Sequence, residues 1–296
     1  MGHESRPVVT SPEVTAPSFL ARHDFLFRRL HSLSGLIPVG AYMVVHLLTN
    51  ASVLEGAATY QKAVYQIHSL GSVLWIVEWV FIFLPLIFHA VMGVVYVKGA
   101  LPNNSSYRYT NNYRYTLQRA SGMIAFLFIF AHVFHMHGWF HVEAWERNIS
   151  EPLGGAQFRP YNAASSLGLA MQNFAWQAFY LIGVLSCVFH LANGIWTMGI
   201  TWGVWITPEA QRRANWVALV FGIGLTAVSL GSFVGAVTVD VPQAKQTEDQ
   251  MYEAKLESGE LKPNDHKRFT EEEAKRVAEI ASESGGVAQG ETESDE

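Results

Sequence analysis

Four histidines of this 296-residue chain lie inside long apolar segments, where an ionisable side chain is costly to bury and usually has a function. Each lies in the second half of its segment. They are His46, His89, His132 and His190. A low-spin haem iron takes one imidazole above and one below the ring plane. The four histidines therefore indicate haem binding, provided that the segments bring them together in pairs.

Five segments are apolar and long enough to cross a bilayer, which takes about 20 helical residues. We expect them at roughly Leu30–Leu48, Leu70–Val97, Ala120–Trp139, Phe174–Gly199 and Trp216–Val239. Unsatisfied backbone groups are too costly in lipid for open strands, so each span should be a helix. The predicted fold class is an all-α membrane protein, a bundle of five transmembrane helices. Pro38 and Pro85 should kink the first and second helices.

The distribution of Lys and Arg in the short connections predicts the orientation of the bundle. One side collects Arg6, Arg22, Arg28, Arg29, Lys98, Arg108, Arg114, Arg119, Arg212 and Arg213. The other side collects Lys62, Arg147 and Arg159. This bias predicts a multi-pass protein of the bacterial cytoplasmic membrane, with its N-terminus in the cytoplasm and its C-terminus outside.

The depths of the four histidines predict how they pair. His46 and His132 lie roughly 20–25 Å along outward-running spans, so both should approach the outer face. His89 and His190 lie late in spans that run the opposite way, close to the cytoplasmic face. We therefore expect two b-type haems, the outer one held by His46 and His132 and the inner one by His89 and His190. A single histidine could instead hydrogen-bond to a neighbouring helix, but four at matched depths favour haem.

A competing ligand follows on the third span. His135 lies three residues after His132, on nearly the same helical face. We prefer His132 because of its depth, and we expect His135, His137 and His141 at the membrane interface.

Other residues could support a haem. Arg28, Arg29 and His31 at the inner end of span one could hold haem propionates, together with Arg119 of span three, although arginines are expected at a cytoplasmic membrane boundary in any case. Small residues would allow either a flat macrocycle or a neighbouring helix to approach the backbone. These are Gly35, Gly40, Gly93, Gly122 and Gly194.

Glu78 is the one acidic residue inside a predicted span. It could relay a proton to or from a quinone head group, or it could be an interfacial carboxylate that reaches water.

Composition excludes several other functions. The single cysteine, Cys187, excludes a disulfide framework, a thiolate-held iron–sulfur cluster and a structural zinc site within this chain. Residues 241–296 carry 7 Lys and Arg against 15 Asp and Glu, whereas the first 240 carry 13 against 10. No basic patch is interleaved with aromatic residues, so no nucleic-acid partner is expected.

These patterns divide the chain into three parts. Residues 1–24 have no apolar signal segment and are expected to form a flexible cytoplasmic N-terminal segment. Residues 25–240 form the five-helix dihaem domain. Residues 241–296 read as an acidic, largely disordered tail, in which Thr270–Ala281 could form a short helix that begins with a capping box of Thr270 and Glu273.

Four stretches resemble the cytochrome b subunit family of succinate dehydrogenases and fumarate reductases, in its single-polypeptide, five-helix, two-haem form. The matching stretches are FLFRRLHSLSGLIPVG from Phe25, FLPLIFHAVMGVVYV, LQRASGMIAFLFIFAHVFH and FYLIGVLSCVFHLANGIWTMGITWGVWITPEAQRR. Together they cover about Asp24 to Val239. The resemblance implies that the histidine of span one pairs with that of span three, and that of span two with that of span four. It also implies a flavoprotein and an iron–sulfur subunit docked on the cytoplasmic face.

Our hypothesis is an electron-transferring, quinone-binding subunit that itself carries no flavin. Electrons from succinate oxidation would pass from the iron–sulfur subunit through the inner and outer haems to a quinone, menaquinone, near the outer face. The alternative is a quinol:fumarate reductase subunit, which would use the same residues. The cytochrome b of a quinol:cytochrome c reductase takes two ligands from one helix, whereas here each span supplies one. A transporter that uses intramembrane histidines would hold no haem, and an absorbance spectrum would distinguish it.

Overall fold

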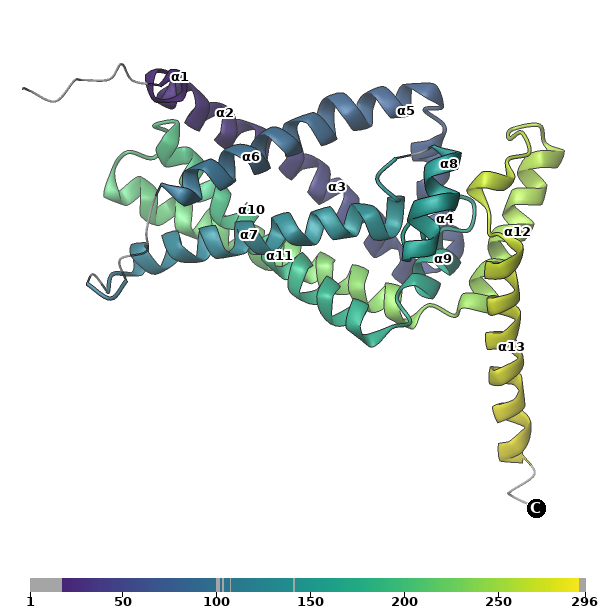
Figure 1. Cartoon of the computed structure of the whole chain (residues 1–296). Coiled ribbons are helices and arrows are strands. Elements are labelled where there is room, and N and C mark those ends of the chain that lie inside the picture. The colour runs from purple at the N-terminus through teal and green to yellow at the C-terminus, as the bar shows by residue number, and fades with distance from the viewer. Residues whose placement is uncertain (1–17, 100–101, 103, 107, 141, 293–296) are drawn as a thin grey trace, which may run out of the picture.

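The computed structural model describes residues 18–99, 102, 104–106, 108–140 and 142–292. Over these residues the regular structure is helical, and the one β-type contact is an isolated bridge between Arg159 and Asn162 (Figure 1). The prediction of an all-α fold is confirmed. Of the predicted flexible segment, residues 1–17 lie outside the described part, and the remainder includes the short helix α1 (Phe19–Arg22).

Five helical segments are long and apolar enough to cross a membrane, as predicted. They are Asp24–Glu55, made of α2 (Asp24–Leu36), α3 (Val39–Ala51) and η1 (Ser52–Glu55); Ser72–Lys98, made of α5 (Ser72–Val77), η2 (Glu78–Phe83) and α6 (Leu84–Lys98); α7 (Thr110–His137); α10 (Phe174–Thr201); and α11 (Pro208–Thr238). The protein is therefore a multi-pass, membrane-embedded helical bundle.

Both prolines mark interruptions of the regular helices, as expected. Pro38 separates α2 from α3, because proline has no N–H to donate to the preceding turn. Pro85 lies in the first turn of α6, where its missing N–H costs little. The preceding segment, η2, is π-helical. This geometry is rare in proteins, and where it occurs it is often at a functional site.

The helices extend beyond the apolar stretches that revealed them. α7 begins at Thr110, ahead of the predicted Ala120, and α11 begins at Pro208, ahead of the predicted Trp216. Hydropathy marks only the part of a helix in the hydrocarbon layer, and polar turns can continue it into the interface. α7 ends before the predicted Trp139, because Gly138 takes a left-handed conformation with φ of 74° and closes the helix.

The remaining helices after α3 cover one end of the bundle. They are α4 (Ala57–His68), α8 (Glu143–Trp145), η3 (Glu146–Ser150), η4 (Glu151–Leu153), α9 (Ala163–Ala170), α12 (Val241–Glu257), η5 (Asp265–Lys267) and α13 (Glu271–Thr292). We call α4, α9, α12 and α13 the cap; Figure 1 shows them together at one end, with α13 projecting away from the bundle. We call the opposite end, where α2, α7 and α11 begin, the basic end.

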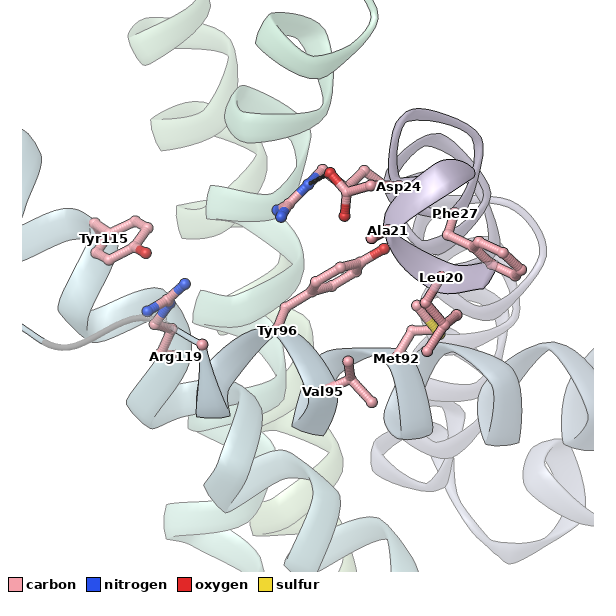
Figure 2. Close-up of a pocket in the computed structure, with 11 residues that line it drawn as sticks. Leu20, Ala21, Asp24, Phe27, Met92, Val95, Tyr96, Tyr115 and Arg119 are labelled. Atoms are coloured by element: carbon pink, nitrogen blue, oxygen red, sulfur yellow. Dashed lines mark hydrogen bonds and ion pairs between the residues drawn. The ribbon is translucent and has the colours of Figure 1, made fainter. Parts of the chain in front are cut away.

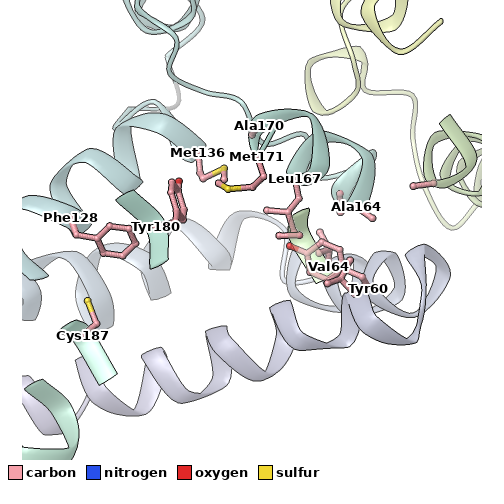
Figure 3. Packing of buried hydrophobic residues seen from close by; sticks show 14 of the residues in the cluster. Tyr60, Val64, Phe128, Met136, Ala164, Leu167, Ala170, Met171, Tyr180 and Cys187 are labelled. Carbon is pink, nitrogen blue, oxygen red and sulfur yellow. The ribbon is translucent and has the colours of Figure 1, made fainter. Parts of the chain in front are cut away.

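The main hydrophobic core joins the cap to the bundle (Figure 3). α9 is buried along its whole length, and its Leu167 packs with Tyr60 and Val64 of α4. Met136 of α7 and Tyr180 of α10 belong to the same cluster. The cap is thus continuous with the core of the membrane helices.

The prediction of a largely disordered tail is wrong for the described residues. α12 buries Val241, Ala244, Glu248 and Tyr252, and it contacts both α4 and α9. These positions recur every three or four residues, which is the spacing of one helical face. Apart from Glu248, the charged residues of α12 are partly or fully exposed. The acidic composition of the segment therefore did not reveal that one face of the helix packs.

The short helix predicted near the C-terminus exists, and it is longer than expected, because α13 spans Glu271–Thr292. Its capping box is formed as predicted. The Thr270 amide donates to the Glu273 carboxylate at 2.7 Å, and the Glu273 amide donates to the Thr270 hydroxyl at 3.3 Å.

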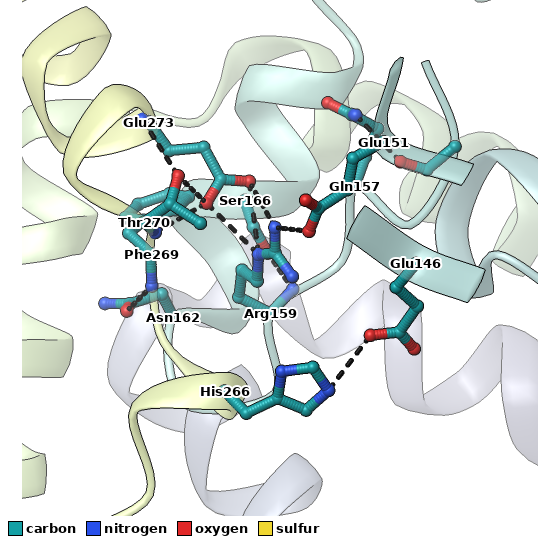
Figure 4. Close-up of polar contacts among 11 residues, drawn as sticks. Glu146, Glu151, Gln157, Arg159, Asn162, Ser166, His266, Phe269, Thr270 and Glu273 are labelled. Atoms are coloured by element: carbon teal, nitrogen blue, oxygen red, sulfur yellow. Dashed lines mark hydrogen bonds and ion pairs between the residues drawn. The ribbon is translucent and has the colours of Figure 1, made fainter. Parts of the chain in front are cut away.

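Glu273 also anchors α13 to the segment that precedes α9 (Figure 4). The Arg159 guanidinium donates from Nε to both Glu273 carboxylate oxygens at 3.1 Å and from Nη2 to Glu151 at 2.9 Å. The side chain of Arg159 is 7% exposed, so these ion pairs are largely shielded from solvent. A further contact joins His266 to the buried Glu146 at 2.9 Å.

Candidate functional site

The structure brings His46 of α3 and His132 of α7 together. Their ring centroids lie 5.8 Å apart, with the ring planes at 75°. An imidazole nitrogen binds a transition metal at about 2 Å, so two rings on opposite sides of one ion have centroids roughly 6 Å apart. The spacing is therefore close to that of two axial ligands of one haem iron.

The second predicted pair has the same geometry. His89 of α6 and His190 of α10 have ring centroids 6.1 Å apart and ring planes at 84°. On α7, 14 residues separate His132 from Gln118, the neighbour of His190, or roughly 20 Å along the helix. The two pairs thus occupy two levels of the bundle, His46 and His132 toward the cap, His89 and His190 toward the basic end.

Backbone carbonyls orient the pair near the basic end. His89 Nδ1 lies 2.8 Å from the carbonyl oxygen of His31, and His190 Nδ1 lies 3.0 Å from that of Gln118. A carbonyl only accepts, so Nδ1 must carry the proton and Nε2 keeps its lone pair. Metal-ligating histidines are commonly oriented in this way. The Nε2 of His190 faces the Gln118 side-chain amide at a weak 3.5 Å.

Two glycines leave the space that the rings of His89 and His190 occupy. A Cβ atom at Gly35 would lie 2.2 Å from the His89 ring, and one at Gly122 would lie 2.7 Å from the His190 ring. Gly93 faces His31 at an ordinary 3.4 Å. The other two candidate glycines differ, because a Cβ at Gly40 would meet Leu191 and one at Gly194 would meet only the Gln118 amide, at 3.9 Å.

A cavity of about 540 Å³ opens toward the basic end of the bundle, and Met92 in its lining lies three residues after His89 on α6 (Figure 2). It lies between α2, α6 and α7, and Arg28, Tyr96 and Arg119 contribute polar groups to its lining. Arg28 is paired with Asp24 at 2.6 Å, and the Tyr96 hydroxyl is buried without a hydrogen-bond partner. A cationic, partly apolar cavity of this kind suits an amphiphilic carboxylate-bearing group such as a haem edge.

The residues expected to bind haem propionates do not all lie at this cavity. Arg119 lines the cavity, but Arg29 and His31 do not. His31 stacks on His89 with ring centroids 4.1 Å apart, and the Arg29 guanidinium lies over the ring of Phe25 at 4.1 Å. His31 Nδ1 and Arg29 Nε are nevertheless buried without hydrogen-bond partners, so both could still receive an acceptor from a bound group.

The expectation that the His135 side chain reaches water at the membrane interface is wrong. Its side chain is buried, stacked on Trp176 with ring centroids 3.8 Å apart. Its Nδ1 lies 2.9 Å from the Tyr180 hydroxyl, which is also 3.2 Å from His132 Nδ1. Sequence reasoning missed Tyr180, because a tyrosine in an aromatic-rich span carries no signal of its partner. Of the other interfacial candidates, His141 lies outside the described residues.

Glu78 is half-buried at the start of the π-helical turn η2, near the cap. It is close enough to Lys267 of η5 for its charge to act on that side chain. Burial lowers the pKa of Lys267, and the negative charge of Glu78 opposes this effect. Lys267 also lies 3.4 Å from His68 Nδ1. Helices α4 and η5 therefore bring titratable groups to the end of the bundle where Glu78 lies.

Comparison with known proteins shows the family of the chain. No known family profile matches it. It is 36% identical over 207 residues to the succinate dehydrogenase cytochrome b558 subunit of Bacillus subtilis (strain 168), a match that spans 70% of this chain and 94% of that protein. The near-complete coverage of the relative, together with five membrane helices, shows that the chain belongs to the family of succinate dehydrogenase cytochrome b subunits.

Proposed function

We propose that this chain is the haem-carrying membrane anchor of a succinate:quinone oxidoreductase. In this proposal His89 and His190 would hold an inner b-type haem, and His46 and His132 would hold an outer one. The observation that carries it is the meeting of four imidazoles from four helices as two pairs, with centroids 5.8 and 6.1 Å apart. The name of the Bacillus relative, a cytochrome b, supports haem as the bound group.

The protein contributes ligands, orientation and burial. Each haem, when bound, accepts and passes on one electron, and the flavin and iron–sulfur chemistry belongs to partner subunits. His31 and Gln118 hold the inner ligands in the tautomer that presents Nε2. Arg119, with Arg28, would neutralise haem propionates that reach the cavity at the basic end.

We further propose that the basic end faces the cytoplasm, where the flavoprotein and iron–sulfur subunits dock. The cap and the C-terminus then lie outside. Electrons would travel from the iron–sulfur subunit toward menaquinone bound near the cap. Moving a charge across the membrane couples this transfer to the membrane potential at roughly 2.3 kcal/mol per 100 mV, so the direction has an energetic consequence. The relative's name favours succinate oxidation over fumarate reduction as the physiological direction.

The test is a set of single alanine variants at His46, His89, His132 and His190, each purified with its partner subunits. Haem content and the reduced-minus-oxidised absorbance spectrum are recorded for each. We expect the His46 and His132 variants to lose the same haem, and the His89 and His190 variants to lose the other. An active complex without bound haem, or losses that do not follow these pairs, would contradict the proposal.

A further inference from the structure

The hydroxyl of Tyr180 lies between His132 and His135 of α7, the two candidates for the same outer haem ligand. It is 3.2 Å from His132 Nδ1 and 2.9 Å from His135 Nδ1. Tyr180 is buried and its phenol has a single proton, so it can donate to one ring and must accept from the other. The two histidines are therefore held in opposite tautomers.

The distances indicate which ring receives the proton. Hydrogen bonds donated by a hydroxyl are typically shorter than those donated by a ring N–H. The shorter contact, to His135, fits a hydrogen bond that Tyr180 donates, and the longer contact fits an N–H of His132 that donates to the phenol oxygen. His132 then carries its proton on Nδ1 and keeps the Nε2 lone pair, whereas His135 carries its proton on Nε2.

Packing fixes both rings in these positions. His135 is stacked on Trp176 at 3.8 Å with an interplanar angle of 13°. His132 is stacked on Phe128 at 5.6 Å and 24°, and a Cβ at Gly183 would lie 2.1 Å from the Phe128 ring, so α10 has no room for a larger residue there. Neither ring can readily exchange its role with the other by rotation.

We propose that Tyr180 is a positioning residue that selects His132, rather than His135, as the outer haem ligand and tunes that haem. This inference rests on the proposed function. An acceptor on Nδ1–H makes an imidazole a stronger electron donor to iron. Tyr180 thereby does for His132 what backbone carbonyls do for the two inner ligands. His46 is held more loosely, because its Nδ1 is 3.5 Å from the Tyr42 hydroxyl.

The experiment uses the purified complex with Tyr180→Phe, and with Tyr42→Phe as the matched loss of a hydroxyl beside the other outer histidine. We expect Tyr180→Phe to retain both haems, to shift the midpoint potential of the outer haem to a more positive value, and to change the electron paramagnetic resonance signal of its oxidised form. The inner haem should be unchanged, which also reports correct folding. Tyr42→Phe should shift the outer midpoint less.

Outer-haem potential and resonance signal equal to wild type in Tyr180→Phe would overturn the proposal. His135→Leu provides a second test, since it should retain the outer haem, and loss of that haem would show that His135 is the ligand. Failure of the proposed function looks different. In that case the active wild-type complex would hold no haem, or His132→Ala and His135→Leu would both keep the outer haem, whatever the behaviour of Tyr180→Phe.

Discussion

The ring of His89 lies directly against the backbone of Gly35. A Cβ atom at position 35 would be 2.2 Å from His89 Cε1, well inside the 3.0 Å that real Cβ contacts essentially never breach. The same ring is hydrogen-bonded to the carbonyl of His31, on the helix that carries Gly35. Helix α2 therefore fixes the position of His89 in two ways. Gly35 leaves space for the ring, and the carbonyl of His31, one turn earlier, accepts its hydrogen bond.

Gly35→Ala should cost the complex most of its inner haem. The added methyl group must either displace the His89 ring or shift α2 away from α6. Both movements change the position of His89, because α2 also supplies the carbonyl to which this ring is hydrogen-bonded. The inner and outer haems are measured separately by redox titration of the absorbance spectrum, and the outer haem should be retained. Gly93→Ala is the matched control, because its Cβ would meet His31 at an ordinary 3.4 Å. Full inner-haem content in Gly35→Ala would show that His89 is not confined as described.

Glu78→Gln should slow quinone reduction while leaving both haems in place. Glu78 is half-buried near the cap, on the π-helical turn η2, at the end where we propose that quinone binds. A positioned acid or base contributes about 10²–10⁴-fold to a proton-transfer step, so we expect at least about a tenfold fall in turnover. Succinate:quinone activity is compared with succinate:artificial-acceptor activity, which should not change. Glu55→Gln, an exposed carboxylate near the same end, should retain activity in both assays.

The bundle and the histidine pairs could be predicted from sequence because both depend on one-dimensional signals. Apolar stretches of about 20 residues are typical of membrane helices, and the late position of each histidine in its span predicts its depth. His46 meets His132, and His89 meets His190, because helices that alternate in direction place these late positions at matching levels.

The cap could not be predicted, because its packing depends on contacts distant in sequence. The buried face of α12 contains Glu248, which looks like a solvated residue of an acidic tail. Its partners, Ala164 and Ser165, lie more than 80 residues earlier. The burial of His135 was missed for the same reason, because its cover is Trp176 of a different helix.

Arg159→Met should loosen α13 from the rest of the cap. The buried guanidinium pairs with Glu273 and Glu151, and its removal leaves two carboxylates without their cation. Breaking a buried ion pair typically costs about 3–5 kcal/mol. Limited proteolysis in the exposed connection 258–264 measures the loosening, and cleavage should accelerate at least tenfold. Arg147→Met removes an exposed pair with Glu143, worth at most about 0.5 kcal/mol, and should leave the cleavage rate near that of the wild type.

The stability of the cap should fall as pH rises from about 5 to 8, and Glu248 is the group responsible. Its carboxylate is fully buried and accepts hydrogen bonds from the backbone amides of Ala164, at 2.5 Å, and Ser165, at 3.3 Å. Burial raises the pKa of Glu248 to about 7, from an ordinary value near 4.5, although these hydrogen bonds oppose the shift. Between these two values the folded cap binds more protons than the unfolded chain, so the free energy of unfolding decreases as pH increases.

Glu248→Gln should remove this dependence. The amide resembles the protonated acid, so the variant should match the wild type near pH 5 and exceed it near pH 8, by up to roughly 3 kcal/mol if the full shift is expressed. The melting temperature of the cap and its proteolysis rate at pH 5, 6, 7 and 8 measure the difference. Glu253→Gln, an exposed carboxylate on the same helix, should keep the wild-type dependence. A wild-type cap whose stability rises over this range would mean that the ionised form of Glu248 is the one the fold prefers, with its hydrogen bonds to α9 outweighing the cost of burial.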